Sequence, residues 1–121
     1  RKVMENAVEE TKNNTKLTLN FALNYGSRDE IVRATNSLIQ QGLTSVTEED
    51  FNNALDTRDL PDVDLLIRTG GDKRLSNYLL WQLAYAELVF VDMEWPRFGR
   101  EDFKKCIEYF NQRQRRFGGL V

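Results

Sequence analysis

Hydrophobic and polar residues alternate over residues 16–25, and a period of two residues predicts a β-strand there. The apolar positions of this strand are Leu17, Leu19, Phe21 and Leu23. The opposite side holds Thr18, Asn20, Ala22 and Asn24. Gly26 ends the alternation. Upstream, the apolar residues of segment 1–12 follow helical spacing, which predicts the last turns of a helix.

Two short sequences have the form of a helix capping box. Ser27 followed by Glu30 is expected to open a helix that ends at Gly42. The apolar face of this helix is predicted to hold Ile31, Ala34, Leu38 and Ile39. Thr47 followed by Asp50 resembles a second capping box, which opens a short helix before the turn at residues 59–62.

Two apolar runs, 63–68 and 88–91, predict short buried strands. Ser76 is expected to cap a helix between them, over residues 76–84. A last helix is predicted over residues 101–117. Its apolar face consists of Phe103, Cys106, Ile107, Phe110 and Phe117. Its basic end, which suits the helix dipole, consists of Arg113, Arg115 and Arg116.

The predicted order of elements is therefore α-β-α-α-β-α-β-α. Strands separated by helices favour an α/β fold with a parallel sheet flanked by helices. Three strands make a small sheet, and a parallel sheet needs both faces covered. We therefore expect a partner half of the domain outside residues 1–121.

Composition narrows the possible functions. The chain has 121 residues and a net charge of −2, with no basic excess to indicate a nucleic-acid-binding surface. It contains no histidine, which excludes Ser-His-Asp and Cys-His catalysis and His-ligated zinc. The single cysteine, Cys106, excludes an internal disulfide and is interpreted as inert packing. No run approaches the roughly 18 apolar residues of a membrane span. The composition fits a cytoplasmic α/β or α+β domain. The chain opens on Arg1 rather than Met, so we expect it to be a piece of something longer.

The candidate chemistry lies just after the 63–68 strand. Arg68 ends that strand, at the edge of an α/β sheet where ligands bind. Gly70 and Gly71 allow a sharp turn, and Arg74 follows six residues after Arg68, so both guanidinium groups can converge on one anion. Ser76 adds a hydroxyl donor at an expected helix N-terminus. This pattern predicts a phosphate or diphosphate cradle, and it is not a Walker A loop.

Plainer interpretations stay open at this point. The two arginines can be surface groups in water, and Ser76 can be a simple helix cap. Glu87 fits either a salt-bridge partner or one of the few protein ligands of a phosphate-bound Mg²⁺. The aromatic residues nearby are interpreted as core rather than substrate contacts: Trp81, Tyr85 and Phe90.

The segment around these residues resembles the cis-prenyltransferase family. The similarity runs through FALNYGSRDEI (21–31), DLLIRTGGDKRLSNYLLWQLAYAEL (64–88), WPRF (95–98) and RQRRFGG (113–119). It covers the chain from about residue 16 onward and corresponds to the C-terminal half of one cis-prenyltransferase domain. The middle block is highly specific to the family.

The resemblance implies an enzyme that condenses isopentenyl diphosphate onto an allylic diphosphate such as farnesyl diphosphate, with Mg²⁺. The product is a polyprenyl diphosphate lipid carrier, such as undecaprenyl diphosphate, delivered to the membrane, so peripheral membrane contact is a further expectation. Family residues that hold the isopentenyl diphosphate match Arg68, Arg74 and Ser76, with Leu75 offering its backbone. Glu87 matches a carboxylate of the Mg²⁺ site.

The R-x-G motif of the family matches Arg116 to Gly118, a tail that reaches toward the partner's active site in a homodimer. Asp72 stands where the family commonly has Glu, and Ser27 replaces a usual Gly. The catalytic Asp of the family lies in the half that residues 1–121 do not contain. We therefore expect the isolated chain to be inactive. Two alternatives remain: a non-catalytic subunit of a heteromeric cis-prenyltransferase, and a general diphosphate-binding domain.

Overall fold

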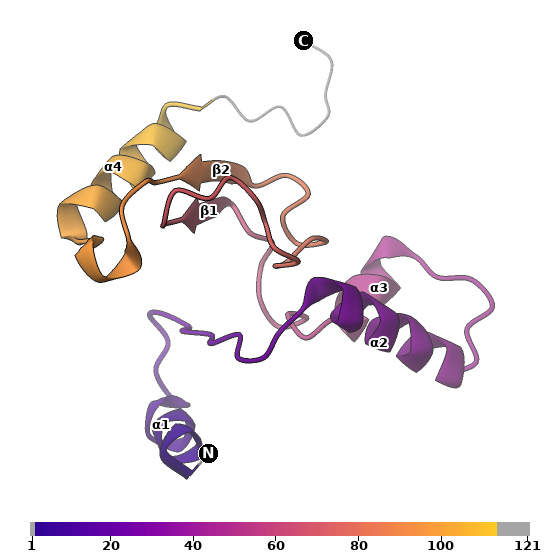
Figure 1. The fold of residues 1–121 in the computed structure, drawn as a ribbon. Coiled ribbons are helices and arrows are strands. Elements are labelled where there is room, and N and C mark those ends of the chain that lie inside the picture. The colour runs from indigo at the N-terminus through magenta and orange to yellow at the C-terminus, as the bar shows by residue number, and fades with distance from the viewer. Residues whose placement is uncertain (1, 114–121) are drawn as a thin grey trace.

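The structure is a computed structural model that describes residues 2–113 (Figure 1). It contains four α-helices, one 3₁₀ helix and two strands among those residues. In chain order the elements are α1 (Lys2–Thr11), α2 (Ser27–Gln40), α3 (Glu48–Ala54), β1 (Leu65–Arg68), β2 (Glu87–Phe90), the 3₁₀ helix Trp95–Arg97 and α4 (Arg100–Asn111). None of the described helices combines the length and the apolar character needed to cross a bilayer.

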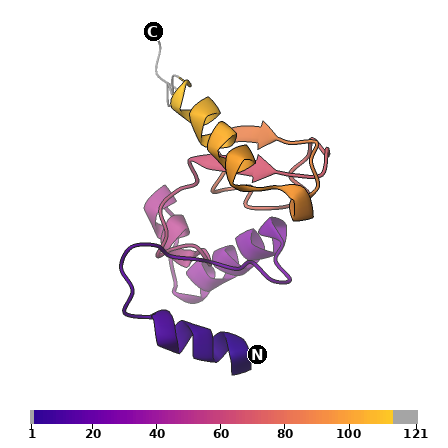
Figure 2. The same cartoon turned by 90° about the vertical axis from the view of Figure 1, so that its left-hand side faces the viewer.

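The two strands form a parallel pair, which confirms the predicted α/β class. Leu65 is opposite Glu87, and Arg68 is opposite Phe90. The predicted strands 63–68 and 88–91 are thus confirmed, although β1 begins two residues later than predicted and β2 lies one residue earlier. Helix α4 follows β2 and lies beside the sheet in both ribbon views (Figures 1 and 2). This arrangement places the end of β1, with Arg68, at the edge from which the candidate loop departs.

The predicted strand at residues 16–25 is not formed. This segment is extended but belongs to no sheet, and its four apolar side chains are 65–80% exposed. A strand is stabilised by hydrogen bonds to a neighbour and by burial of one face, and this segment has neither within the part of the chain described. The three-strand order expected from the sequence is therefore wrong on this point.

The predicted helix at residues 76–84 is also wrong. Ser76, Asn77 and Leu79 have φ angles of 49°, 63° and 44°, in the left-handed region. Non-glycine residues in that region interrupt a right-handed helix, so the segment forms successive turns. One bond of helical spacing remains, from the backbone N–H of Leu83 to the carbonyl of Leu79 at 3.0 Å.

The two predicted capping boxes have opposite outcomes. Thr47 caps α3 as expected: its hydroxyl accepts from the backbone N–H of Asp50 at 3.1 Å, and the Asp50 carboxylate accepts from the N–H of Thr47 at 3.0 Å. At α2 the cap residue is Gly26, without a side-chain hydrogen bond. Ser27 and Glu30 are fully buried instead and bond to distant parts of the chain.

The core is small, and it consists of Ala34, Leu38, Leu55, Leu83 and Cys106. The buried position of Cys106 confirms the packing interpretation, and burial raises the pKa of its thiol. Ile39 and Phe103, predicted to be on core faces, are 64% and 51% exposed. Tyr85, predicted to be core, is 64% exposed. The helix predicted to end at residue 117 ends at Asn111, and the positions of Arg115, Arg116, Phe117 and Gly118 lie outside the described residues.

Candidate functional site

The loop that follows β1 turns sharply at two glycines. Gly70 and Gly71 have φ angles of 91° and 79°, which side-chain-bearing residues rarely adopt. Their backbone N–H groups donate to the carbonyls of Met93, at 2.9 Å, and Val91, at 3.1 Å. The turn predicted from the two glycines is thus present, and it is fastened to the segment that leaves β2.

The structure brings together three of the predicted site residues. One terminal nitrogen of Arg68, Nη1, donates to the hydroxyl of Ser76 at 3.0 Å and to the carbonyl of Arg74. The other, Nη2, donates to Asp72 Oδ2 at 3.2 Å, and Arg74 Nη2 donates to the same oxygen at 2.6 Å. Two guanidinium groups therefore share one carboxylate oxygen inside a loop of eight residues.

The two arginines of this loop differ in how far they are exposed. The Arg68 side chain is 23% exposed and therefore held, whereas the Arg74 side chain is 65% exposed and can swing toward a ligand. Guanidinium groups bind carboxylate and phosphate through the same charge-assisted geometry. A phosphate oxygen can accept the same kind of hydrogen bond that Asp72 Oδ2 accepts here from the two arginines.

No helix dipole assists this site, because the expected helix after Ser76 is absent. Leu75 lies half-buried between Arg74 and Ser76, and its carbonyl accepts from the N–H of Tyr78 at 3.0 Å. The site therefore depends on side-chain charge rather than on free N–H groups at a helix start.

Glu87 is not brought into the same cluster. It is the first residue of β2, opposite Leu65, and so lies at the other end of the sheet from Arg68. Its carboxylate is 4.0 Å from Nε of Arg113, with a side chain 28% exposed. The two positions are three residue steps apart along the strand, roughly 10 Å. The salt-bridge interpretation of Glu87 thus has a partner, though not one of the two loop arginines.

The described residues contain no group of three or more carboxylate or thiolate side chains that would hold a metal ion by themselves. Mg²⁺ commonly takes only one or two protein carboxylates, completed by water and substrate phosphate. A single carboxylate such as Glu87 is compatible with a site of that kind.

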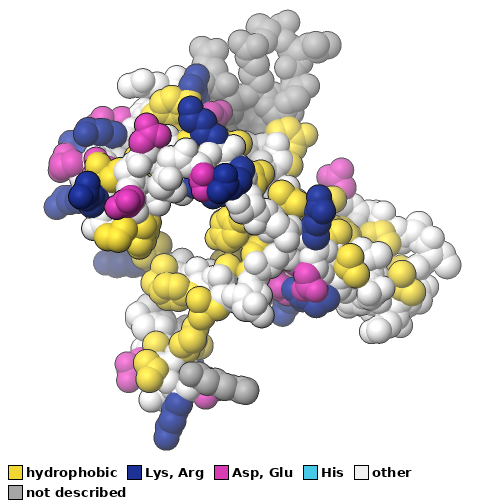
Figure 3. Space-filling view, viewed as in Figure 1, with side chains coloured by type: hydrophobic (Ala, Val, Ile, Leu, Met, Phe, Trp, Pro, Cys, Tyr) yellow, Lys and Arg dark blue, Asp and Glu magenta, His cyan; other side chains and the backbone are white. Residues whose placement is uncertain are grey.

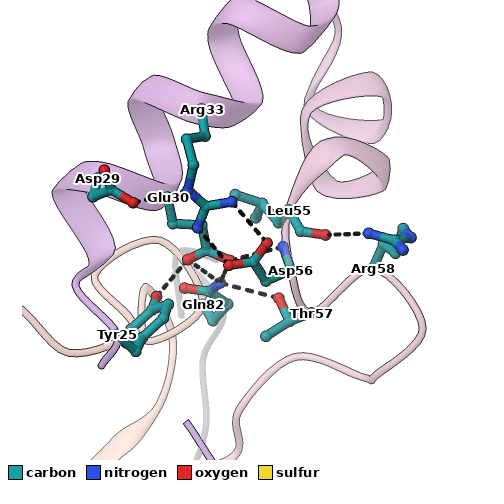
Figure 4. Close-up of polar contacts among 9 residues, drawn as sticks. All are labelled: Tyr25, Asp29, Glu30, Arg33, Leu55, Asp56, Thr57, Arg58 and Gln82. Carbon is teal, nitrogen blue, oxygen red and sulfur yellow. Dashed lines mark hydrogen bonds and ion pairs between the residues drawn. The ribbon is translucent and has the colours of Figure 1, made fainter. Parts of the chain in front are cut away.

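A second polar cluster, which the sequence did not reveal, surrounds the buried carboxylate of Glu30 (Figure 4). Glu30 accepts hydrogen bonds from the Tyr25 hydroxyl, from the backbone N–H of Asp56 at 2.9 Å and from Gln82 Nε2 at 3.1 Å. Burial and the hydrogen bond to Glu30 raise the pKa of Tyr25 to about 12. This cluster joins α2 to two loops that are 26 and 52 residues away in the chain.

An ion pair closes the exposed side of this cluster. Arg33 donates to both carboxylate oxygens of Asp56, at 3.0 and 2.6 Å, and its Nε donates to Asp29 at 2.8 Å (Figure 4). The guanidinium holds the pKa of the Asp56 carboxyl below its usual range. A cavity of about 560 Å³ lies beside the pair, with one wall formed by residues 20–26.

The start of α2 also holds the segment that follows the arginine loop. The N–H of Ser27 donates to the carbonyl of Asn77 at 2.8 Å, and the N–H of Arg28 donates to Asn77 Oδ1 at 2.9 Å. In return, the N–H of Leu80 donates to the hydroxyl of Ser27 at 2.9 Å. In the sequence, Ser27 and Glu30 were the only indication of these long-range contacts. Because the same two residues match a local capping box, the sequence analysis assigned them to that local role instead.

The comparisons with known proteins agree with one another. A family model described as "Putative undecaprenyl diphosphate synthase" matches residues 1–118. The isoprenyl transferase of Fusobacterium nucleatum is 55% identical over 120 residues, which are 99% of this chain and 52% of that protein. The ditrans,polycis-undecaprenyl-diphosphate synthase of Micrococcus luteus, whose name specifies (2E,6E)-farnesyl diphosphate, is 47% identical over 99% of this chain and 51% of its own length.

A solved structure gives the same result for the fold. Lavandulyl diphosphate synthase from Lavandula x intermedia, in complex with dimethylallyl diphosphate, superimposes with a TM-score of 0.87 and 31% identity. The match covers 98% of this chain and 55% of that one. The chain therefore spans about half the length of the relatives it matches.

Proposed function

Since this chain belongs to the undecaprenyl diphosphate synthase family of cis-prenyltransferases, we propose that it supplies the isopentenyl diphosphate site of such an enzyme. The observation that carries the proposal is that Arg68 and Arg74 both donate to Asp72 Oδ2 in the loop after β1, while Arg68 also donates to the hydroxyl of Ser76. The arrangement already holds an anionic group, and the ligand we propose for it is a diphosphate.

Each loop residue has a distinct part in this proposal. Arg68 is fixed by its bonds to the loop and faces the diphosphate as a held donor. Arg74 is exposed to solvent and exchanges its bond to Asp72 for one to a phosphate oxygen. Ser76 offers its hydroxyl, and Leu75 contributes backbone groups between them. Charge-assisted bonds of this kind are the strong ones, at about 1.5–3 kcal/mol each.

We further propose Glu87 as one protein ligand of Mg²⁺. When bound, the metal neutralises negative charge on a departing diphosphate. The contribution of Glu87 is one carboxylate, partly shielded from water and adjacent to Arg113. The rest of the site belongs to residues outside those described and to substrate phosphates.

The proposed reaction joins two substrates and releases diphosphate. The allylic C–O bond of a substrate such as farnesyl diphosphate breaks, the double bond of isopentenyl diphosphate attacks the allylic carbon, and a proton is lost to form a new cis double bond. This chain binds and orients isopentenyl diphosphate for that attack. Repetition of the reaction yields a polyprenyl diphosphate.

We propose that residues 1–121 alone do not complete this reaction, because the chain spans only about half of its relatives. Arg116 and Gly118 are proposed to contact the active site of a second subunit in a homodimer. Purified chain supplied with farnesyl diphosphate, isopentenyl diphosphate and Mg²⁺ is expected to form no product. Product formation under those conditions contradicts the proposal that residues 1–121 are inactive alone.

The binding role is tested by calorimetric titration of the chain with isopentenyl diphosphate and, separately, with inorganic pyrophosphate. We expect isopentenyl diphosphate to bind more tightly, since the site is proposed to recognise the substrate and not only its charge. Equal affinity for the two ligands indicates a general diphosphate-binding domain and contradicts the proposal.

A further inference from the structure

Arg28, in the first turn of α2, has a guanidinium group without a partner. Its side chain is exposed, and it forms no hydrogen bond or ion pair with any other described residue. Five other arginines lie within 4.0 Å of a carboxylate: Arg33, Arg58, Arg68, Arg74 and Arg113. Arg97 and Arg100 are also unpaired within the described chain. Of the three, only Arg28 is bonded to the residue that follows the arginine loop, which is defined as residues 69–76.

The backbone of Arg28 is fastened to the end of this loop. Its N–H donates to Asn77 Oδ1 at 2.9 Å, and the N–H of Ser27 donates to the carbonyl of Asn77 at 2.8 Å. Asn77 directly follows Ser76, so these bonds hold the α-carbons of Arg28 and Ser76 within about 12 Å of each other. An extended arginine side chain reaches about 7 Å from its α-carbon, and the Ser76 side chain and a bound diphosphate span the rest.

The start of α2 offers a ligand this side chain and not its free N–H groups. The first two N–H groups of the helix, those of Ser27 and Arg28, already donate to oxygen atoms of Asn77. The N–H of Glu30 donates to the carbonyl of Gly26 at 3.1 Å. The guanidinium of Arg28 is thus the group through which α2 is able to contact an anion in the loop.

The charge of the loop indicates what such a contact supplies. Arg68 and the loop together hold three cations and one carboxylate, a formal charge of +2: Arg68, Lys73, Arg74 and Asp72. A diphosphate ester carries roughly three negative charges near pH 7. Without a metal ion, about one negative charge of the ligand is therefore unbalanced, and one further guanidinium neutralises it.

We propose that Arg28 is a third guanidinium of the diphosphate site, which binds the phosphate nearer to α2 while Arg68 and Arg74 hold the other. This inference rests on the proposed function, because that function supplies the diphosphate. A guanidinium suits the task, since its planar donors match two phosphate oxygens at once. Arg28 is a binding residue in this proposal and takes no part in making or breaking bonds.

The test is calorimetric titration of the chain without added Mg²⁺, so that the contribution of the arginines is measured alone. We expect Arg28→Gln and Arg28→Met to weaken isopentenyl diphosphate binding by about fivefold to twentyfold, as the loss of one charge-assisted hydrogen bond does. Arg28→Lys keeps the charge and should weaken it by about threefold or less. Isopentenyl monophosphate, which has only one phosphate, should lose less than about twofold in the two neutral variants.

The matched control is Arg100→Gln. Arg100 is also exposed and unpaired among the described residues, and it also follows a glycine at a helix start. In Figure 1 the start of α4 lies on the opposite side of the strand pair from α2, and Figure 3 shows cations interspersed with carboxylates over α4. Its replacement should change affinity by less than about twofold. The inference is overturned if Arg28→Gln and Arg100→Gln have equal effects, or if monophosphate and diphosphate binding weaken equally.

Hydrogen exchange of residues 76–80 should be unchanged in both neutral variants, because the bond to Asn77 comes from the backbone of Arg28. If the chain binds too weakly to titrate, the same variants are placed in a chimera in which this chain replaces the matching half of the Fusobacterium nucleatum isoprenyl transferase. There the KM for isopentenyl diphosphate should rise about fivefold to twentyfold, with kcat changed less than threefold. An unchanged KM overturns the inference. If Arg74→Ala weakens binding and Arg28→Gln does not, only this inference fails, whereas no effect of either refutes the proposed function as well.

Discussion

Arg68 Nη1 donates a hydrogen bond of 3.0 Å to the hydroxyl of Ser76, and this bond ties the end of β1 to the far end of the arginine loop. The same nitrogen bonds to the carbonyl of Arg74. Among the described residues, the guanidinium of Arg74 bonds only to Asp72. The two arginines are thus unequal: Arg68 organises the loop, while Arg74 is available to a ligand.

Arg74→Ala is expected to weaken isopentenyl diphosphate binding by about tenfold to a hundredfold, the equivalent of one charge-assisted hydrogen bond of about 1.5–3 kcal/mol. The loop itself should keep its conformation, since the Arg68 bonds remain. Arg68→Ala should weaken binding at least as much and also increase hydrogen exchange of residues 69–76. Titration calorimetry and exchange on both variants separate the two roles.

The control for these variants is Arg58→Ala. Arg58 is an exposed arginine whose ion pair with Asp59 is long, at 3.9 Å, and it lies outside the loop. Its replacement should leave isopentenyl diphosphate affinity unchanged within about twofold. Comparable weakening in all three variants means that general positive charge attracts the ligand and that the loop has no specific role.

Tyr25 gives the stability of the chain a dependence on alkaline pH. Its pKa in the folded chain is raised to about 12 from 10.0, by burial first and then by the hydrogen bond to Glu30. A folded-state pKa above the unfolded one means that stability is fully present below pH 10 and is lost as the pH rises toward 12. Tyr25→Phe removes the titrating hydroxyl and therefore this part of the loss.

The measurement is the free energy of unfolding of the chain and of Tyr25→Phe between pH 8 and pH 11.5. The difference between the two should be constant up to about pH 9 and then shrink, since only the native chain loses the Tyr25 contribution. Other groups titrate equally in both proteins and cancel. A difference that stays constant over the whole range contradicts the role assigned to the Tyr25–Glu30 bond.

The sequence predicted the features that depend on neighbouring residues. The Thr47–Asp50 capping box and the Gly70–Gly71 turn need only a few adjacent positions, and both are present. The convergence of Arg68, Arg74 and Ser76 was predictable for the same reason, because all three lie within nine residues.

Features that depend on distant residues were misjudged. The alternation at residues 16–25 has the correct period for a strand, but pairing requires a neighbour that the described residues do not offer. Ser27 and Glu30 match a capping box locally, yet they bond to Leu80 and Gln82, more than 50 residues away. Left-handed φ angles at Ser76 and Asn77 replaced the expected helix because Asn77 bonds to the start of α2.

Thr47→Ala is expected to lower the free energy of unfolding by about 0.5–2 kcal/mol, the usual cost of losing a side-chain helix cap. α3 has only seven residues, so its first turn is a large part of the helix. Thr44→Ala, an exposed threonine before the cap, is the control and should cost less than about 0.5 kcal/mol. Chemical denaturation of both variants makes the comparison, and equal losses contradict the capping role.

The contact between Gly26 and Asn77 offers a test of how the arginine loop is held in place. A methyl group built on Gly26 would lie 2.8 Å from Asn77 Nδ2, closer than a carbon atom is normally allowed. The Asn77 side chain cannot simply move away, because its Oδ1 accepts from the N–H of Arg28. Gly26 has a φ of −147°, which alanine adopts readily, so any cost of Gly26→Ala arises from this contact rather than from the backbone.

We therefore expect Gly26→Ala to destabilise the chain by about 1–3 kcal/mol in the presence of Asn77, as overpacking does. The same change should cost less than about 0.5 kcal/mol in an Asn77→Gly background, where the obstructing amide is absent and glycine accepts the φ of 63°. A double-mutant cycle on the free energy of unfolding measures the coupling. Because Ser76 directly precedes Asn77, Gly26→Ala should also weaken isopentenyl diphosphate binding. If the cycle shows no coupling between Gly26 and Asn77, the start of α2 does not position the arginine loop.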